Sequence, residues 1–362
     1  MAEPIRMCID RMFPIHRIVR AAHRAVGENP RNVPLLRPSE PGGGRHPMRM
    51  GLPTKLLWRD RRELRVRFMG GDPQVTKKVE AFAHQWSDFC GITFRFGSDA
   101  DAEIRVAFKP DDGSWSWVGV EALEITDRNE PTMNFGWLTP TTDDQEYSRV
   151  VLHEFGHALS CIHEHSQPAA EIPWNKEAVY AEYAKPPNRW SREEVDVNLF
   201  ERYAAGDTQF TAFDRQSIML YAIDKKLTRD GFEIGWNRVL SSTDKDFIGT
   251  QYPKAASPVV RLQPGASPVA ASIGAHGEED LYEFSVTRPA VHTVETTGPT
   301  DVVMSLLGPD DQAKVVAFDD DSGLGRNAKI ESALTPGTYY VRVKHYRPRG
   351  MGDYQIALTS AT

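Results

Sequence analysis

The sequence predicts an α+β domain followed by a domain made of β-strands alone. Up to residue 254, segments of alternating apolar and polar residues are separated by stretches whose apolar residues recur at helical spacing. Beyond residue 255, short segments rich in β-branched and aromatic residues follow one another, with turn residues between them. A chain of 362 residues can hold two domains of ordinary size. We therefore expect an N-terminal arm at 1–51, an α+β domain at 52–254 and a β-sandwich at 255–362.

The first 51 residues read as a leader or prosegment. Residues 1–50 contain nine arginines against four acidic residues. Apolar residues between 15 and 26 have the spacing of one short amphipathic helix, and the prolines and glycines of 38–47 favour a mobile connection. No apolar segment typical of a secretory signal follows Met1. The arm could lie on the acidic remainder of the chain, or it could be a solvated basic tail.

The α+β domain is predicted from its periodicity. Half-buried strands are expected where apolar and polar residues alternate, at 64–68, 92–96 and 104–108. Apolar residues from Val75 to Trp86 recur at helical spacing and predict an amphipathic helix. Thr142 to Gln145 have the spacing of a capping box and are expected to start a further helix. On this helix Val151, Phe155 and Leu159 would face the core.

The most informative segment is 153–157, which reads His-Glu-Phe-Gly-His. Residues four apart lie on one face of a helix, so His153 and His157 can bind one metal ion. Glu154 is placed to take a proton from a metal-activated water. His163 comes six residues after His157, so the chain must turn to bring it back as a third ligand. Three histidines with one open position are typical of a catalytic zinc site.

The pattern from His153 to His163 resembles the metzincin signature H-E-x-x-H-x-x-G-x-x-H, with Ser160 in the place of the glycine. Glycine allows a sharp turn after the helix, and a serine there costs about 1 kcal/mol if its backbone is left-handed. Met219 lies 56 residues after His163 and resembles the methionine of the metzincin Met-turn. Tyr221 resembles the tyrosine of the astacin and serralysin branches, whose phenol can approach the metal.

Similarity to astacins extends over about 52–254. The segments that carry it are 114–119, 163–168, 172–174, 240–244 and 251–253. The disulfide framework of animal astacins is absent, and Gln167 stands where those proteins commonly have an arginine. The chain therefore resembles a microbial astacin-like protein, or a generic zinc-dependent metzincin, more than an animal astacin. In astacins the acidic residue after the third histidine helps to receive the trimmed N-terminus, and Glu164 occupies that place.

The resemblance implies a zinc-dependent endopeptidase that hydrolyses a protein or peptide substrate, held extended beside an edge strand, outside the cell. It implies zinc held by His153, His157 and His163, with Glu154 and Tyr221 as catalytic residues. His165 is a rival third ligand that would need a different turn. A non-catalytic binding protein on an impaired peptidase fold is the alternative, motivated by Ser160, and a structural adhesion module would bind no zinc.

The three cysteines do not predict a disulfide framework, and an odd number leaves at least one thiol free. Cys90 reads as a small buried residue. Cys161 follows the predicted zinc helix, but its spacing matches no ligand position. A thiolate at Cys8 could occupy the open zinc position and keep the enzyme latent.

The last hundred residues predict an antiparallel sandwich, with strands at 281–286, 302–307, 339–343 and 354–358. This part resembles the bacterial pre-peptidase C-terminal domain at 279–284, 319–323 and 334–340. The acidic run Asp319 to Asp321 could bind Ca²⁺ through carboxylate oxygens, or it could form a turn that faces water.

Composition excludes other classes. A net charge of −7 and the lack of a recognition motif give no reason to expect a nucleic-acid partner. No apolar run is long enough to span a membrane. The sequence does not predict the oligomeric state.

Overall fold

The computed structural model describes residues 8–9, 11, 13–32, 55–110, 112–167, 170–186, 188–200, 213–254, 259–274, 278–312, 314–347 and 350–361. The chain forms two compact units. The first contains the described residues up to 29 and from 55 to 254, and the second contains 30–32 and 259–361. The connections predicted at 38–47 and 255–258 lie outside the described residues. No helix among the described residues is both long and apolar enough to cross a membrane.

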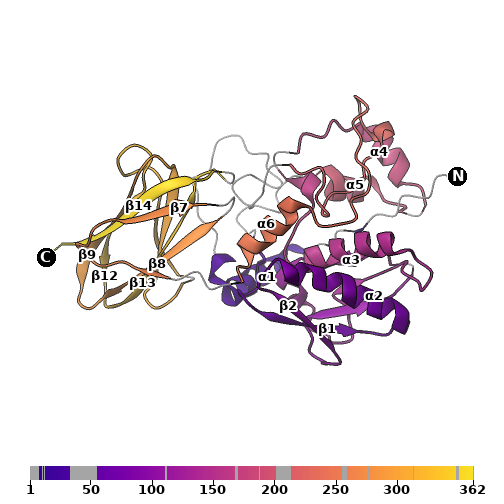
Figure 1. Ribbon diagram of the computed structural model, residues 1–362, viewed down its shortest axis with the longest axis horizontal. Coiled ribbons are helices and arrows are strands. Elements are labelled where there is room, and N and C mark those ends of the chain that lie inside the picture. Colours follow the sequence, from indigo (N-terminus) through magenta and orange to yellow (C-terminus); the bar gives the residue numbers. More distant parts are fainter. Residues whose placement is uncertain are drawn as a thin grey trace. The chain divides into compact units, whose positions relative to one another are not determined.

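A five-stranded sheet forms the base of the first unit (Figure 1). Its strands are β1 (Glu63–Phe68), β2 (Thr93–Gly97), β3 (Ile104–Ala107), β4 (Trp115–Ser116) and β5 (Met133–Asn134). They lie in the order β2-β1-β3-β5-β4. All neighbouring pairs are parallel except β4 with β5, which is antiparallel and places β4 at one edge. This edge strand contacts α3.

The predicted strand at 104–108 is buried more completely than its alternation suggested. All four residues of β3 are buried, including Arg105. Its guanidinium donates hydrogen bonds of 2.8 to 2.9 Å to the carbonyl oxygens of Glu130, Ala102 and Ile125. A charged side chain can be buried in a sheet when carbonyl oxygens accept its hydrogen bonds. The prediction that this strand is half-buried was therefore wrong.

Two helices pack together on this sheet, α2 (Pro73–Ala83) and α3 (Asp144–Ala158). The Asp72 side chain caps α2, which continues as a 3₁₀ turn that contains Trp86. The predicted start of α3 was one residue too early. Asp143 is the N-cap and accepts from the Glu146 N–H, whereas the Thr142 hydroxyl accepts from the Thr139 N–H.

The predicted core face of α3 is confirmed. Val151, Phe155 and Leu159 are fully buried. The rings of Phe94 and Phe155 meet edge to face with centroids 5.0 Å apart. The Trp86 indole N–H donates to the Leu152 carbonyl at 2.9 Å. These contacts fix the helix that carries the first two histidines.

The remaining helices of the first unit are α1 (Ile15–Glu28), α4 (Lys176–Tyr183), α5 (Arg192–Val195) and α6 (Ser242–Gln251). Short helical turns lie at η3 (Gly119–Glu124), η4 (Glu164–Ser166), η5 (Asp196–Phe200) and η6 (Lys225–Leu227). The helix predicted in the arm is therefore present as α1, and it packs on η3.

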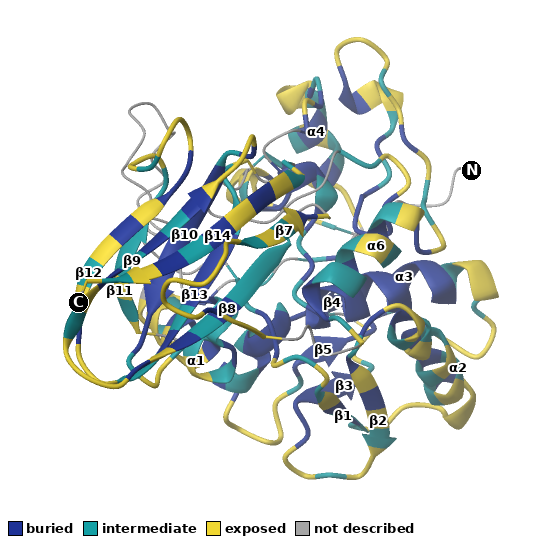
Figure 2. Ribbon diagram, turned by 60° about the vertical axis from the view of Figure 1, so that its left-hand side comes forward, coloured by how far each residue is buried: buried dark blue, intermediate teal, exposed yellow. Residues whose placement is uncertain are grey.

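The second unit is the predicted sandwich of two sheets. One sheet has the order β11-β10-β13-β8-β6 and the other β12-β9-β14-β7. The strands are β6 (Val260–Arg261), β7 (Val269–Ile273), β8 (Glu279–Val286), β9 (Ala290–Thr297), β10 (Val302–Leu307), β11 (Val315–Asp319), β12 (Lys329–Leu334), β13 (Gly337–His345) and β14 (Gly352–Ser360). Figure 2 shows buried residues alternating with less buried ones along β14, as expected for a strand with one core face.

Candidate metal centre and active site

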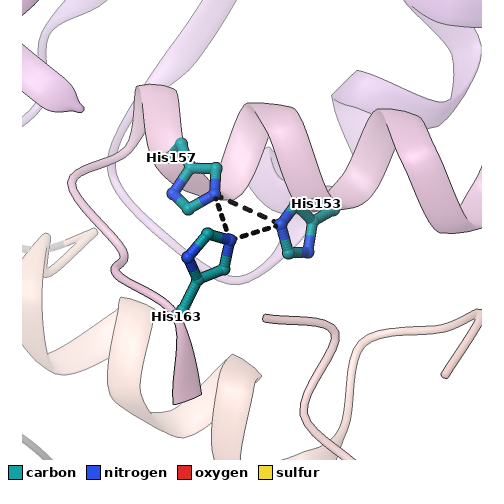
Figure 3. A group of neighbouring side chains, drawn as sticks. All are labelled: His153, His157 and His163. Atoms are coloured by element: carbon teal, nitrogen blue, oxygen red, sulfur yellow. Dashed lines mark hydrogen bonds between the residues drawn. The ribbon is translucent and has the colours of Figure 1, made fainter. Parts of the chain in front are cut away.

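Three imidazoles converge on one point in the first unit (Figure 3). His153 and His157 project from α3, and His163 projects from the segment after the helix. Their Nε2 atoms lie 3.1 to 3.2 Å from one another, and all three side chains are buried. Within the described part of the chain, these three histidines are the group of side chains arranged to hold a metal ion.

The partners of the Nδ1 atoms show which nitrogens carry lone pairs. Nδ1 of His153 lies 2.8 Å from the Ile218 carbonyl oxygen, and Nδ1 of His157 lies 2.9 Å from the Cys161 carbonyl oxygen. A carbonyl only accepts, so both Nδ1 atoms carry the proton and both Nε2 atoms present a lone pair to the centre. Burial, with His157 and His163 nearby, holds the pKa of His153 well below its usual range, which favours the neutral form.

This donor set fits zinc. Lone pairs facing one another at 3.1 to 3.2 Å repel unless a cation lies between them. Four-coordinate zinc with Zn–N distances of about 2.0–2.1 Å separates its nitrogen ligands by about 3.3 Å. The spacing found here is close to that value.

Ser160 makes the turn that brings His163 back. Its φ is +74°, in the left-handed region that favours glycine. Its hydroxyl donates to the Leu56 carbonyl at 2.6 Å and lies 3.1 Å from the Tyr252 hydroxyl. Gly119 leaves room for this side chain, because a Cβ there would collide with the Ser160 Oγ. Serine therefore adopts the left-handed turn at the position where the metzincin signature has glycine.

A second turn, at 217–221, lies against the histidines. Its Ile218 carbonyl is the partner of His153, and the Met219 sulfur packs so closely on Gly156 that a Cβ there would collide with it. Asp244, at the start of α6, accepts from the Ser217 hydroxyl at 2.7 Å and from the Ile218 N–H at 2.8 Å. Asp244 thus orients His153 through the turn.

Sequence reasoning missed this role of Asp244. The only local signal was the spacing of Ser241 and Asp244, which form a capping box at the start of α6. A capping box does not reveal that the same carboxylate also holds a turn from elsewhere in the chain.

Glu154 and Tyr221 both contact the arm. Glu154 is fully buried, and its carboxylate lies near enough to the Cys8 thiol to interact with it electrostatically. The Tyr221 hydroxyl donates to the Cys8 carbonyl at 3.0 Å, and its ring lies 4.3 Å from that of His163. Burial, and next the charge of Glu154, raise the pKa of the Cys8 thiol well above its usual range. The arm at Cys8 therefore lies beside both predicted catalytic residues.

Two neighbours of His163 have other contacts. The His165 Nε2 lies 2.7 Å from the Asn198 carbonyl oxygen, and its ring stacks on that of His163 at 5.1 Å. His165 is outside the group that could hold a metal ion. The Glu164 carboxylate accepts a hydrogen bond of 2.7 Å from the Asp214 N–H. Burial raises the pKa of Glu164 to about 8. Its role as receiver of a trimmed N-terminus stays a prediction.

The described residues of the arm are not a solvated tail. On α1, Arg20 and Arg24 form ion pairs of 2.5 and 3.0 Å with Glu124, whose side chain is fully buried. Arg17 donates to the Glu124 carbonyl at 2.6 Å, and the Phe13 ring stacks on Trp117 at 3.8 Å. The basic charge of the arm therefore meets an acidic residue of the first unit.

The second predicted metal site is the acidic run Asp319 to Asp321 in the second unit, and its first residue, Asp319, holds a turn. Asp319 accepts hydrogen bonds from the Ser322 N–H at 3.0 Å and the Lys329 N–H at 2.8 Å. These contacts give the carboxylate a role in the turn. A calcium ion at Asp319 to Asp321 stays a prediction.

Comparison with known proteins decides the family. The chain is 49% identical to myroilysin over 55% of its own length and 96% of that structure, with a TM-score of 0.53. The chain is an astacin-like metzincin. A second myroilysin structure is 41% identical, covering 68% of this chain and 99% of that one, with a TM-score of 0.45. No curated protein matches the chain.

A fish hatching enzyme zinc-protease, high choriolytic enzyme 1 from Oryzias latipes, is 16% identical, covering 54% of this chain and 92% of that one, with a TM-score of 0.39. The bacterial pre-peptidase C-terminal domain matches residues 278–345, within the second unit. This astacin-like metzincin is therefore a metalloprotease with a C-terminal domain of the kind found in bacterial peptidases.

Proposed function

We propose that this metalloprotease is a zinc-dependent endopeptidase that hydrolyses peptide bonds of extended protein substrates. His153, His157 and His163 would hold the zinc. The observation that supports this most strongly is the convergence of three buried Nε2 atoms beside the buried Glu154 carboxylate. A non-catalytic binding protein is not favoured, because Ser160 adopts the turn that completes the cluster.

Glu154 is the general base of the proposed reaction. Zinc, when bound, supplies a Lewis acid that acidifies water and polarises a peptide carbonyl. The Glu154 carboxylate takes the proton from the attacking water and returns it to the leaving amine. Its neighbour His153 is held by Ile218, so the base and the ligand keep a fixed relation on α3.

Tyr221 donates a hydrogen bond to the substrate carbonyl as negative charge develops on its oxygen. Its hydroxyl already donates to a peptide carbonyl, that of Cys8, at 3.0 Å. A substrate carbonyl in the same place would receive the same bond. Backbone bonds to the edge strand would align the rest of the substrate, as the Ile9 N–H does when it donates to the Ser114 carbonyl at 3.0 Å.

The arm keeps this proposed enzyme latent. Cys8 interacts with both proposed catalytic residues, electrostatically through its thiol with Glu154 and by a hydrogen bond from the Tyr221 hydroxyl to its carbonyl. The arginines of α1 on Glu124 anchor the arm. Activation then requires that the arm leave the cleft. An extracellular location and the domain boundaries after residues 51 and 254 are also part of the proposal, and they rest on the family resemblance.

The variant Glu154→Gln tests the proposed base. We expect the full chain with Glu154→Gln to keep its zinc and to lose peptide cleavage, because an amide cannot accept the proton. Glu80→Gln, at a partly exposed position on α2, is the matched control and should change neither. Undiminished cleavage by the Glu154→Gln protein, with zinc bound, would refute the assignment.

A further inference from the structure

The contact of Arg11 with Asp112 and Trp115 has the form of a binding subsite. The Arg11 guanidinium lies over the Trp115 ring, 3.7 Å from its centroid, and pairs with the Asp112 carboxylate at 2.5 Å. The second oxygen of Asp112 accepts from the Trp115 indole N–H at 3.2 Å. Trp115 therefore both orients the carboxylate and offers its ring face to the cation.

Asp112 and Trp115 lie where the arm pairs with the edge of the sheet. Asp112 and Trp115 flank Ser114, the residue whose backbone pairs with the arm at Cys8 and Ile9. Arg11 is three residues from Cys8, whose carbonyl accepts a hydrogen bond from the proposed catalytic residue Tyr221. In an extended chain three residues span about 10 Å. A substrate that runs along the same edge strand must pass the same two side chains.

We propose that Asp112 and Trp115 form a specificity subsite for an arginine side chain of the substrate, two to four residues from the scissile bond. Arg11 fills the subsite in the latent protein, and a substrate arginine fills it once the arm has left. This inference rests on the proposed endopeptidase function. Its chemistry is that of a guanidinium clamp, in which a carboxylate pairs with the edge of the cation and an indole covers its face.

The subsite also accounts for how the arm competes with substrate. Arg11 is partly exposed, as is Asp112, so the pair remains in contact with water. Such a contact contributes modestly, and a guanidinium from a substrate can replace it once the arm is released. The same two residues thus hold the arm in the latent protein and select the substrate after activation.

The test uses the full zinc-loaded chain with Cys8→Ala and Arg11→Gln, which weakens the hold of the arm by removing its side-chain interactions with Glu154 and Asp112. Matched fluorogenic peptides carry arginine or citrulline, its uncharged isostere, at each position from two to four residues on either side of the cleaved bond. We expect arginine at one of these positions to raise kcat/KM about tenfold over citrulline, as a cation–π contact and an ion pair together can supply. Adding Asp112→Asn should reduce this ratio to about two- to fivefold, the share left to the cation–π contact with Trp115, whereas Asp246→Asn, at an exposed position on α6, should leave the ratio unchanged.

Binding is measured separately in the same chain with Glu154→Gln added, using the same labelled peptides. Tighter binding of the arginine peptide that depends on Asp112 supports the subsite, whether or not the protein cleaves peptides. Absence of cleavage in every variant, including those that keep Glu154, would instead refute the proposed function. Equal binding and equal cleavage of the arginine and citrulline peptides at every position would overturn the subsite.

Discussion

Replacing Ser160 tests how the turn after the metal-binding helix is held. Its φ of +74° lies where a side chain costs about 1 kcal/mol relative to glycine. Its hydroxyl donates to the Leu56 carbonyl at 2.6 Å, and such a neutral bond contributes about 1 kcal/mol. The two effects oppose each other. Ser160→Gly is therefore expected to change the free energy of unfolding by less than about 1 kcal/mol.

Ser160→Ala separates the two effects, because it keeps the left-handed strain and removes the hydroxyl. The Tyr252 hydroxyl also loses its neighbour at 3.1 Å. We expect the alanine variant to be less stable than the parent by about 1 to 2 kcal/mol, and less stable than the glycine variant by about 1 kcal/mol. Urea unfolding in the presence of a zinc chelator measures these differences in the free energy of unfolding. All eight tryptophans lie between residues 58 and 236, so their fluorescence reports on the first unit alone.

Two outcomes would contradict this reasoning. If the alanine variant equals the glycine variant, the turn stores no strain. If the alanine variant equals the parent protein, the hydroxyl contributes nothing, and the Leu56 contact is incidental.

Three further predictions concern the surroundings of the site. Burial raises the pKa of Glu164 from 4.5 to about 8, so folding favours its protonated form. The stabilising contribution of Glu164 is therefore complete below about pH 4.5 and is lost as the pH rises through 8. In Glu164→Gln this loss of stability should disappear from unfolding curves measured between about pH 5 and 9. Asp244→Asn should weaken zinc binding about 10- to 100-fold in a competition titration, since Ile218 would orient His153 less firmly; unchanged affinity would remove Asp244 from the site. Cys8→Ala in the full chain should raise peptide cleavage, whereas Cys90→Ala should not; equal rates would argue against latency through Cys8.

The site could be predicted from sequence where local geometry determines it. The spacing of His153 and His157 places both rings on one helix face in any regular helix, and the core positions of α3 came from the same periodicity. Seven of the fourteen described strands could be predicted, because alternation and β-branched or aromatic runs are also local properties. Short strands such as β4 and β5, and the longer β9 and β12, were missed.

Contacts between distant segments could not be predicted in this way. The burial of Arg105 depends on carbonyl oxygens supplied by loops at 125–130, and the role of Asp244 depends on a turn 26 residues earlier. The sequence suggested that Cys8 reaches the metal position, but it could not indicate that Glu154 and Tyr221 would be the partners of Cys8. The one-residue error at Thr142 arose because two adjacent residues can both cap a helix, and only Asp143 does.

Zinc analysis of single-histidine variants tests the central claim most directly. The full chain should contain one zinc per molecule, His163→Ala should lose most of it, and His165→Ala should retain it. Zinc that persists in His163→Ala, or that is lost only in His165→Ala, would contradict the three-histidine centre on which the proposed chemistry depends.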